Sequence, residues 1–292
     1  MKTLSVWVKA ARLRTLPAAI APVAVGTALA ASEDSFHILV LLAALVGALF
    51  IQIGTNLSND YSDARRGADT EDRLGPVRVT AGGLVPPKQV LIATWISFAI
   101  AIVAGSYLVA VAGWELIAVG AASILAGVLY TGGPRPYGYE GLGEIFVFLF
   151  FGVVAVTGSY FIQTEQLTWP AFELSIPVGL LASAILVVNN VRDIDTDRRV
   201  GKRTLAVRLG RSRTRTMYCV MVALALLFPL ELWLRAGLPV TVLIAMFAAP
   251  LAIAPVRAVT QRTDGGALNK ALADTAKLQL GYCLLLAIGL LI

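Results

Sequence analysis

Charged residues are scarce in this sequence. Asp, Glu, Lys and Arg make up 14% of its 292 residues, whereas about a quarter is usual for a soluble domain. Hydrophobic residues make up 58%, and segments such as 38–51 and 145–161 would be apolar on every side of a helix. A soluble enzyme needs helices with a polar face, so the sequence predicts an all-α integral membrane protein.

Other scarcities exclude classes of chemistry. The one histidine, His37, lies in a short acidic loop, which argues against histidine general-base catalysis and against a histidine-ligated zinc site. The two cysteines, Cys219 and Cys283, lie in apolar runs. We expect both to be small buried hydrophobic side chains rather than disulfide or metal partners. The sequence has no Walker A loop and no dinucleotide-binding fingerprint.

Nine apolar segments have the length that a bilayer requires of a spanning helix, roughly 17–25 residues. An amphipathic stretch, residues 1–14, precedes them; we expect it to lie at the membrane surface, and it has no signal-peptide cleavage site. The predicted spans are 15–31, 38–59, 88–112, 114–130, 145–163, 171–191, 217–234, 239–256 and 272–292.

The distribution of lysine and arginine orients this bundle. If the amino terminus is cytoplasmic, only Arg235 of the 24 Lys and Arg residues falls on the opposite side. Because cytoplasmic loops are rich in Lys and Arg, we predict nine spans in the cell membrane, with the amino terminus inside and the carboxyl terminus outside. The net charge of +6 then reflects orientation. With no basic patch of interleaved aromatics, it does not predict nucleic-acid binding.

Two short stretches concentrate the acidic residues on the predicted cytoplasmic face. They follow the second and sixth spans, and their aspartates are Asp60, Asp63, Asp69 and Asp72 in the first and Asp193, Asp195 and Asp197 in the second. Carboxylates three or four residues apart share one helix face, where a divalent cation removes their repulsion. Because hard oxygen ligands suit Mg²⁺, these stretches predict a Mg²⁺–diphosphate site.

The neighbours of these aspartates fit a diphosphate. Asn59 and Asn190 offer neutral oxygens, and Arg78 and Lys202 offer positive charge. Arginines 65–66 and 198–199 are interpreted as topology charges. Metal-assisted departure of diphosphate needs no histidine and suits such a site. Aromatic faces stabilise a carbocation, and the candidates for that role are Tyr130, Phe148 and Tyr160.

The two acidic stretches resemble each other. Asn59-Asp60-x-x-Asp63-x-Arg65-Arg66-Gly67 stands beside Arg192-Asp193-x-Asp195-x-Asp197-Arg198-Arg199-x-Gly201. Each closes an even-numbered span. The sequence therefore predicts one transmembrane domain, 1–292, with a parallel internal pseudo-repeat and one Asp motif in each half.

These motifs resemble the signatures of the UbiA superfamily of intramembrane prenyltransferases, Asn-x-x-x-Asp-x-x-x-Asp and Asp-x-x-x-Asp. Asn59 and Asp63 match the first two positions of the first signature. A glycine stands at the third position, and Asp69 is the nearest carboxylate. Asp193 and Asp197 match the second signature in full.

Flanking segments are similar to those of the 1,4-dihydroxy-2-naphthoate prenyltransferases within that superfamily. They are Trp7-x-x-Ala10-x-Arg12-x-x-Thr15-Leu16-Pro17, Asn59-Asp60-Tyr61, Gly141-Leu142-Gly143-Glu144, Asn189-Asn190-x-Arg192-Asp193 and Gly201-Lys202-x-Thr204-Leu205. The resemblance implies a nine-helix bundle. It also implies transfer of a polyprenyl group from an allylic polyprenyl diphosphate to 1,4-dihydroxy-2-naphthoate, with loss of diphosphate and CO₂, to give a demethylmenaquinone.

The resemblance also implies roles for individual residues. Mg²⁺ and diphosphate would be bound by Asn59, Asp63, Asp193 and Asp197, with Asp60 and Asp69 as further metal ligands. Phosphate oxygens would be bound by Arg78, Lys202 and Asn190, and the aromatic acceptor would be oriented by Tyr130 and Glu144. The isoprenoid tail would lie in a side opening between helices, towards the lipid bilayer.

Three other functions fit parts of the pattern. A UbiA-type enzyme could act on 4-hydroxybenzoate or a different acceptor, and the acceptor pocket decides between them. A CDP-alcohol phosphotransferase also uses clustered aspartates and a metal, but its motif is single, and the second cluster argues against it. An ion transporter would carry its acidic residues in the middle of a span, whereas here they lie at the edge.

Overall fold

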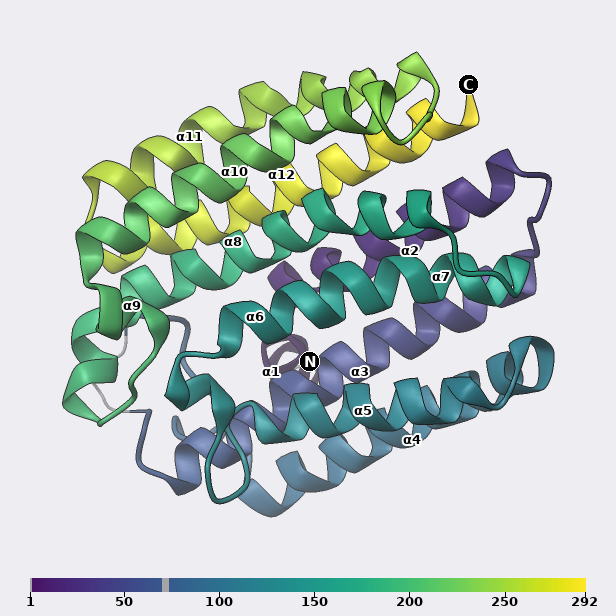
Figure 1. Ribbon diagram of the computed structural model, residues 1–292. Helices are drawn as coiled ribbons and strands as arrows, with labels where there is room; N and C mark the ends of the chain where they lie inside the picture. The colour runs from purple at the N-terminus through teal and green to yellow at the C-terminus, as the bar shows by residue number, and fades with distance from the viewer. Residues whose placement is uncertain (1, 70–73) are drawn as a thin grey trace.

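The computed structural model describes residues 2–69 and 74–292, and every regular element in these ranges is helical. Glu71, Asp72 and Arg73 of the first acidic stretch lie outside the described residues. The elements in chain order (Figure 1) are α1 (Lys2–Ala11), η1 (Leu13–Thr15), α2 (Pro17–Ser32), α3 (Ile38–Arg65), α4 (Pro87–Ala112), α5 (Glu115–Leu129), η2 (Tyr137–Glu140), α6 (Gly143–Val147), η3 (Phe148–Val154), α7 (Ala155–Thr164), α8 (Trp169–Arg199), α9 (Leu205–Leu209), α10 (Arg211–Leu234), η4 (Val240–Ala248), α11 (Ala249–Gln261) and α12 (Gly265–Leu291).

Each predicted span contains a helix, but the helices differ in length. Among the described residues, seven helices are long and apolar enough to cross a membrane: α3, α4, α6–α7, α8, α10, η4–α11 and α12. The helices α2 and α5 have 16 and 15 residues, or about 24 and 23 Å, against a hydrocarbon core of about 30 Å. The all-helical prediction is confirmed, while the crossing of all nine segments stays a prediction.

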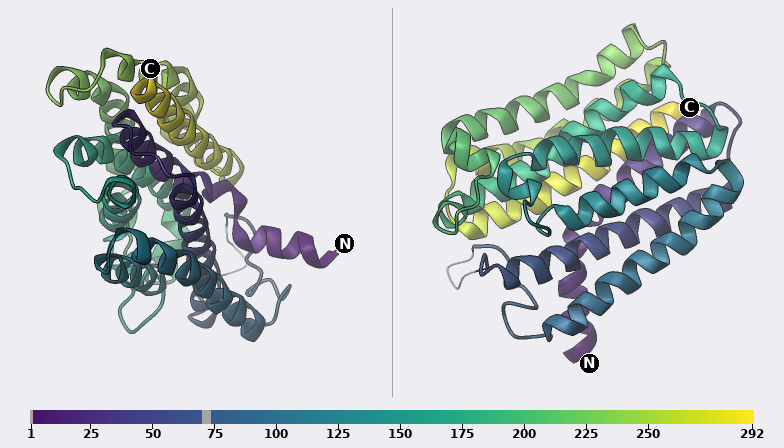
Figure 2. Two further views of the ribbon diagram at one scale, coloured as in Figure 1. Left: turned by 90° about the vertical axis from the view of Figure 1, so that its right-hand side faces the viewer. Right: turned by 60° about the horizontal axis from the view of Figure 1, so that its bottom comes forward.

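The helix α8 lies at the centre of the bundle. In its most apolar stretch 78% of the residues are buried, compared with 22% in α3 and in α4. Figures 1 and 2 show α3, α4 and α5 grouped on one side of it and α10, α11 and α12 on the other. The largest apolar core joins α8 to α2, α7, α10 and α12. Because α8 is central, the side chains on its last turns lie between the two groups of helices.

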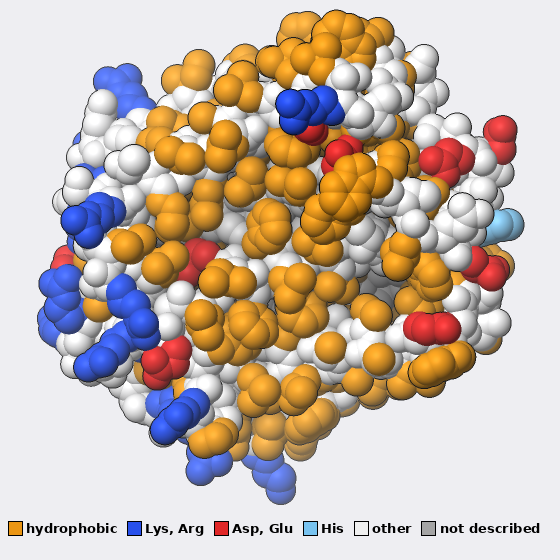
Figure 3. Space-filling model, viewed as in Figure 1, with side chains coloured by type: hydrophobic (Ala, Val, Ile, Leu, Met, Phe, Trp, Pro, Cys, Tyr) orange, Lys and Arg blue, Asp and Glu red, His pale blue; other side chains and the backbone are white. Residues whose placement is uncertain are grey.

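The two ends of the bundle differ in charge. Figure 3 shows most Lys and Arg side chains gathered at the end where α9 lies, with some acidic side chains among them. It shows acidic side chains and the histidine at the opposite end, and mainly apolar side chains between the two ends. Large apolar side chains such as Trp95, Val103 and Phe247 are exposed on the outer faces. A bilayer requires such an apolar surface, because its core has no water to bond polar groups. The backbone polar groups within a helix meet the same requirement by bonding to one another.

The helices α3 and α8 continue past the predicted ends of their spans. The apolar pattern stops at residues 59 and 191, whereas the helices end at Arg65 and Arg199. Hydropathy marks where a helix leaves the apolar layer, and backbone hydrogen bonding continues beyond that point. Both acidic motifs therefore lie on the last turns of two rigid helices.

The two helix ends have the same geometry. Gly67 and Gly201 have left-handed backbone angles, with φ of 65° and 76°. The N–H of the residue after each glycine donates to the carbonyl oxygen of Asp63 (3.0 Å) or Asp197 (2.9 Å). This is a Schellman cap, in which glycine avoids the strain that other residues meet. The cap explains why glycine stands where the first family signature has its third carboxylate.

The fifth span packs on α8 through two glycines. Its middle part, η3, is π-helical, and π-helical turns are frequent at functional sites. A Cβ atom on Gly152 would lie 2.6 Å from the Cα atom of Gly179 and 2.9 Å from the carbonyl oxygen of Ser175. Both neighbours are backbone atoms, so a side chain at 152 forces the helices apart.

We expect Gly152→Ala to destabilise the protein by about 1–3 kcal/mol, because overpacking against backbone cannot be relieved by a rotamer change. Gly158→Ala on the same helix is the control, since its Cβ would meet no heavy atom within 4 Å. The midpoint of thermal unfolding in detergent, followed by tryptophan fluorescence, measures both. Equal midpoints for the two variants would contradict the packing described for Gly152.

Candidate active site

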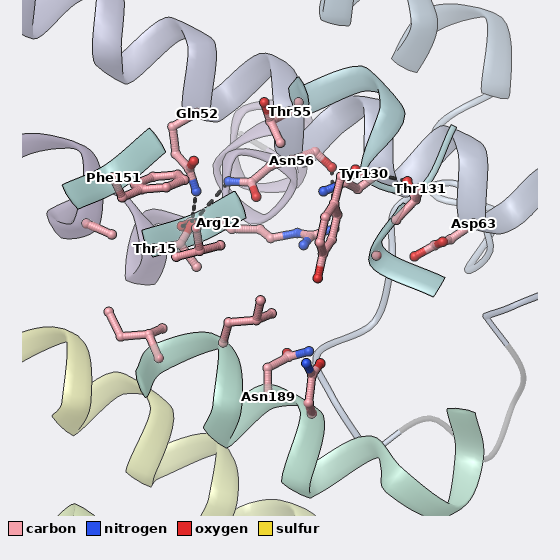
Figure 4. Close-up of a pocket in the computed structure, with 18 of the residues that line it drawn as sticks. Arg12, Thr15, Gln52, Thr55, Asn56, Asp63, Tyr130, Thr131, Phe151 and Asn189 are labelled. Atoms are coloured by element: carbon pink, nitrogen blue, oxygen red, sulfur yellow. Dashed lines mark hydrogen bonds between the residues drawn. The ribbon is translucent and has the colours of Figure 1, made fainter. Parts of the chain in front are cut away.

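A cavity of about 240 Å³ lies between the ends of α3 and α8, at the Lys- and Arg-rich end of the bundle. Figure 4 shows side chains from the α3 side and from α8 pointing into it, among them Asp63, Tyr130 and Asn189. Most residues selected from the sequence line this cavity: Asn59, Asp63, Arg78, Tyr130, Asn190, Asp193, Asp197 and Lys202. Asp60, Asp69 and Glu144 do not line it.

Asp63 has three polar partners at the cavity. Its Oδ1 accepts a hydrogen bond from the Tyr139 hydroxyl at 2.7 Å and lies 3.3 Å from Lys202 Nζ. Its Oδ2 lies 3.6 Å from a guanidinium nitrogen of Arg78. The side chain is 3% exposed, and a carboxylate buried this deeply needs such partners.

Tyr139 links the loop of η2 to the end of α8. Its carbonyl oxygen accepts from the N–H of Arg203 (2.9 Å), and Lys202 Nζ lies 4.6 Å from its ring centroid. Burial, followed by the charge and hydrogen bond of Asp63, raises the pKa of the Tyr139 phenol well above its ordinary value. The phenol therefore keeps its proton and remains a donor to Asp63.

The aspartates of α8 lie on different faces. Arg192 Nε and a terminal nitrogen donate to the two oxygens of Asp193 at 2.7 and 2.5 Å. Asp197, one turn further on, also lines the cavity. Asp195 points outward, with a side chain 68% exposed and 2.7 Å from Arg211. The i, i+4 spacing thus selects Asp193 and Asp197 for the cavity and leaves Asp195 in solvent.

The two asparagines of the site are held by neighbours. The hydroxyl of Thr131 donates to Asn59 Oδ1 at 2.9 Å. Asn190 Nδ2 donates to Glu144 Oε1 at 2.9 Å. Glu144 is buried behind the cavity wall, and its Oε2 has no hydrogen-bond partner among the residues that the structure describes.

Asp60 and Asp69 surround the segment that carries Arg78. Both oxygens of Asp60 accept backbone N–H groups, from Val79 at 3.1 Å and from Thr80 at 2.9 Å. Asp69 Oδ1 lies 3.6 Å from Arg78 Nε. Asp60 and Asp63, expected to share a cation, therefore have different surroundings: Asp63 faces the cavity and Asp60 binds a loop. Their metal roles stay predictions.

Several further polar residues of the cavity were given no role from the sequence, although Arg12 and Thr15 belong to a segment that carries the family resemblance. Gln52 Nε2 and Asn56 Nδ2 donate to the Thr15 hydroxyl at 3.3 and 3.1 Å. Arg12 lies beside Tyr130 in Figure 4, and its backbone is left-handed, with φ of 53°. A signal was present for Gln52 and Asn56, since isolated polar residues one turn apart in an apolar span mark functional positions.

Two of the three aromatic candidates lie away from the cavity. The Tyr160 hydroxyl donates to Glu33 Oε2 at 2.6 Å, near the end of α2 remote from the acidic motifs. Phe148 does not line the cavity, and Phe151 of the same π-helical segment does. A π-helix has more residues per turn than an α-helix, so α-helical spacing does not give the direction of a side chain in this segment. Tyr130 alone of the three lines the cavity.

The donor set suits Mg²⁺ held together with an anion. Three carboxylates and five amide side chains, those of Asn59 and Asn190 among them, line the same cavity as Arg78 and Lys202. Within residues 2–69 and 74–292, no three His, Cys, Asp or Glu side chains approach closely enough to hold a metal by themselves. Because Mg²⁺ keeps several water or phosphate oxygens among its ligands, carboxylates spread over two helix ends fit a metal bound with diphosphate.

Comparison with known proteins places these residues in a family. The model of the UbiA prenyltransferase family matches residues 19–281. The 1,4-dihydroxy-2-naphthoate octaprenyltransferase of Mycobacterium tuberculosis (strain ATCC 25618 / H37Rv) is 43% identical, over 98% of this chain and 97% of that protein. The enzyme with the same name from Escherichia coli (strain K12) is 40% identical, over 97% and 94%.

A solved structure agrees with this match. A UbiA homolog from Archaeoglobus fulgidus bound to GPP and Mg²⁺ has a TM-score of 0.67, over 96% of this chain and 99% of that one. At 14% sequence identity this likeness shows a shared fold. The family match covers most of the chain, including both acidic motifs, and the chain therefore belongs to the UbiA prenyltransferase family.

Proposed function

We propose that this protein transfers a polyprenyl group from an allylic polyprenyl diphosphate to 1,4-dihydroxy-2-naphthoate. The bond between the allylic carbon and the diphosphate oxygen breaks, and a carbon–carbon bond forms at the ring carbon that loses CO₂. The product is a demethylmenaquinone in its quinol form, a step of menaquinone biosynthesis. The observation that carries the proposal is the cavity in which both family motifs meet Arg78 and Lys202. The relatives' activity supports the choice of acceptor.

The cationic and the acidic side chains of the cavity would bind the donor in different ways. Arg78 and Lys202, which pair with Asp63, would also contact the phosphate oxygens. Asn59, Asp63, Asp193 and Asp197 would hold Mg²⁺, which when bound neutralises the charge that develops on the departing diphosphate. Asn190, fixed by Glu144, would add a carbonyl oxygen. The protonated Tyr139 would keep Asp63 oriented throughout.

The acceptor would bind on the side of the cavity nearer Tyr130. The ring of Tyr130 projects into the cavity close to Arg12 (Figure 4), so a planar anionic acceptor would find an aromatic face and a guanidinium there. Glu144, one hydrogen bond behind the wall, would orient the acceptor through Asn190.

The setting of the reaction follows from the charge distribution. We propose a single multi-pass domain with nine spans in the cell membrane, in which the cavity opens to the cytoplasm and the carboxyl terminus lies outside. The clustering of Lys and Arg at the cavity end supports this orientation (Figure 3). The matching Schellman caps of α3 and α8 support the pseudo-repeat with one Asp motif per half.

The acceptor can be identified by product mass. Purified protein with Mg²⁺ and one prenyl diphosphate would be given 1,4-dihydroxy-2-naphthoate, 4-hydroxybenzoate and a CDP-alcohol in separate reactions. We expect a product from the naphthoate alone, heavier by the prenyl group and lighter by CO₂. A prenylated 4-hydroxybenzoate that keeps its carboxylate would replace the proposed acceptor, and transfer of a phosphoalcohol would refute prenyl transfer itself.

The carboxylates of the cavity should matter to catalysis and the exposed one should not. Asp63→Asn and Asp193→Asn are each expected to lower kcat by on the order of a hundredfold or more, because each removes a charge that faces the diphosphate. Asp195→Asn is the matched control, since Asp195 lies in the same motif and points to solvent. The assay uses labelled prenyl diphosphate after confirmed membrane insertion. Full activity of either cavity variant would sink the assignment.

The orientation can be tested with single cysteines in a chain that lacks Cys219 and Cys283. Ser35→Cys, in the loop after α2, should react with a membrane-impermeant maleimide on intact cells. Ser212→Cys, at the start of α10, should react only after the membrane is opened, because the predicted topology puts the two positions on opposite sides. Labelling of Ser212→Cys on intact cells would reverse the proposed orientation.

A further inference from the structure

Two amide side chains of the cavity wall have their orientation fixed by one hydroxyl group. Thr15 donates its hydroxyl proton to the carbonyl oxygen of Arg12 at 3.0 Å. The Thr15 oxygen then offers only lone pairs, and it accepts from Gln52 Nε2 at 3.3 Å and from Asn56 Nδ2 at 3.1 Å. Figure 4 shows both bonds ending at Thr15. Because a hydroxyl oxygen has two lone pairs, its bonding capacity is filled.

The orientation of the Asn56 amide is fixed a second time. Its Nδ2 also donates to the carbonyl oxygen of Ala11 at 3.1 Å, so both N–H groups of this amide are used within the protein. Ala11 and Arg12 provide these carbonyl groups at a turn where Arg12 has a left-handed backbone, with φ of 53°. A left-handed backbone is unfavourable for a residue with a side chain. The structure keeps this turn at a cost, and the turn supplies both carbonyl acceptors.

With their nitrogens engaged, the two amides leave their oxygens as free acceptors. Neither Gln52 Oε1 nor Asn56 Oδ1 has a hydrogen-bond partner among residues 2–69 and 74–292. Both residues line the cavity, and Asn56 is only 4% exposed. They lie one helical turn apart on α3, an axial separation of about 6 Å. The wall thus offers two fixed hydrogen-bond acceptors to a ligand in the cavity.

The chemistry of these acceptors does not suit the prenyl donor. An ionised diphosphate and an isoprenoid tail carry no O–H or N–H group, so either of them beside the amide oxygens would leave two acceptors without partners, which opposes binding. A ligand with hydroxyl groups satisfies them. The guanidinium of Arg12, which donates to the backbone oxygen of Asn56 at 3.3 Å, adds a positive charge beside the pair. The three groups together fit a carboxylate that also carries hydroxyl donors.

We propose that Gln52 and Asn56 select the acceptor by accepting hydrogen bonds from its ring hydroxyl groups. The inference rests on the prenyl transfer proposed above and names the residues that choose its acceptor. 1,4-Dihydroxy-2-naphthoate would place its carboxylate at Arg12. Asn56 would accept from the 1-hydroxyl group, which it shares with the neighbouring carboxylate. Gln52, one turn further along α3, would accept from the 4-hydroxyl group, which has no such neighbour.

This arrangement distinguishes the two acceptors considered above. 4-Hydroxybenzoate has one hydroxyl group, across the ring from its carboxylate, so with the carboxylate at Arg12 it leaves at least one amide oxygen without a donor. A site built to bond a hydroxyl group rejects an analogue without it far more strongly than an apolar pocket rejects a missing methylene. Gln52 and Asn56 are thus specificity-determining residues that take no part in the bond changes.

The inference can be tested with two ligands that differ by one hydroxyl group. 1-Hydroxy-2-naphthoate keeps both rings, the carboxylate and the 1-hydroxyl group of 1,4-dihydroxy-2-naphthoate and lacks the 4-hydroxyl group. Dissociation constants would be measured by calorimetry on the full-length protein in detergent, under anaerobic reducing conditions, with Mg²⁺ and inorganic diphosphate so that no prenyl transfer occurs. Gln52→Met removes the amide at similar length. Ser58→Ala is the control, since Ser58 is buried on the same helix and does not line the cavity.

We expect the wild-type protein to bind the dihydroxy ligand about tenfold or more tightly than the monohydroxy ligand. In Gln52→Met this ratio should fall to within about twofold of unity, while the affinity for 1-hydroxy-2-naphthoate stays within about twofold of wild type. Ser58→Ala should keep the wild-type ratio. Thr15→Val retains both amides and frees them to turn, so its ratio should lie between these values. If Gln52→Met does not fold, Thr15→Val decides.

Equal affinity of the wild-type protein for the two ligands, or no binding of the dihydroxy ligand, would overturn the inference. An unchanged ratio in the deciding variant would do the same. An equal loss of affinity for both ligands would also overturn it, because Gln52 would then serve only the shape of the cavity. The proposed function survives each of these results if the wild-type protein still prenylates 1,4-dihydroxy-2-naphthoate. Absence of that product refutes the proposed function itself.

Discussion

The charge balance around Asp63 is the constraint on which the active-site end of this protein depends. Asp63, Asp193 and Asp197 lie around one cavity inside an otherwise apolar bundle. A buried carboxylate that loses its partner costs about 3–5 kcal/mol. The fold meets this demand by bringing Lys202 from the end of α8 and Arg78 from the loop after α3 to the same carboxylate. The segments that carry Arg78 and Lys202 are thus held in place by their ion pairs with Asp63 of α3.

This dependence explains several features that seem unrelated in the chain. The loop at 74–86 is held because Asp60 accepts the N–H groups of Val79 and Thr80, the two residues after Arg78, which places Arg78 at the cavity. The loop of η2 is held because Tyr139 bonds to Asp63 through its hydroxyl and to Arg203 through its carbonyl. The Schellman caps turn the chain sharply after both motifs, so that the returning segments carry their cations to the helix ends.

How far the sequence predicts this arrangement depends on the range of the interaction. Helix content, the acidic motifs and the i, i+4 selection of Asp193 and Asp197 are local properties and could be read from spacing. The direction in which the Asp60 side chain points could not be read from spacing, because it depends on backbone N–H groups nineteen and twenty residues away. The π-helical turn at 148–154 escaped for a similar reason: hydropathy records composition, and packing against neighbours sets helix geometry.

An apolar cavity of about 570 Å³, lined by residues of α2, α3, α4, α5, η3 and α7, adjoins the polar one. The polar cavity carries charges that a bilayer disfavours. Gln52 and Phe151 line both cavities, so the surroundings change from polar to apolar at their level. In the donor of the proposed reaction the reacting carbon joins the charged head to the apolar tail. It would lie at this level, near Tyr130 and the carboxylates of the polar cavity.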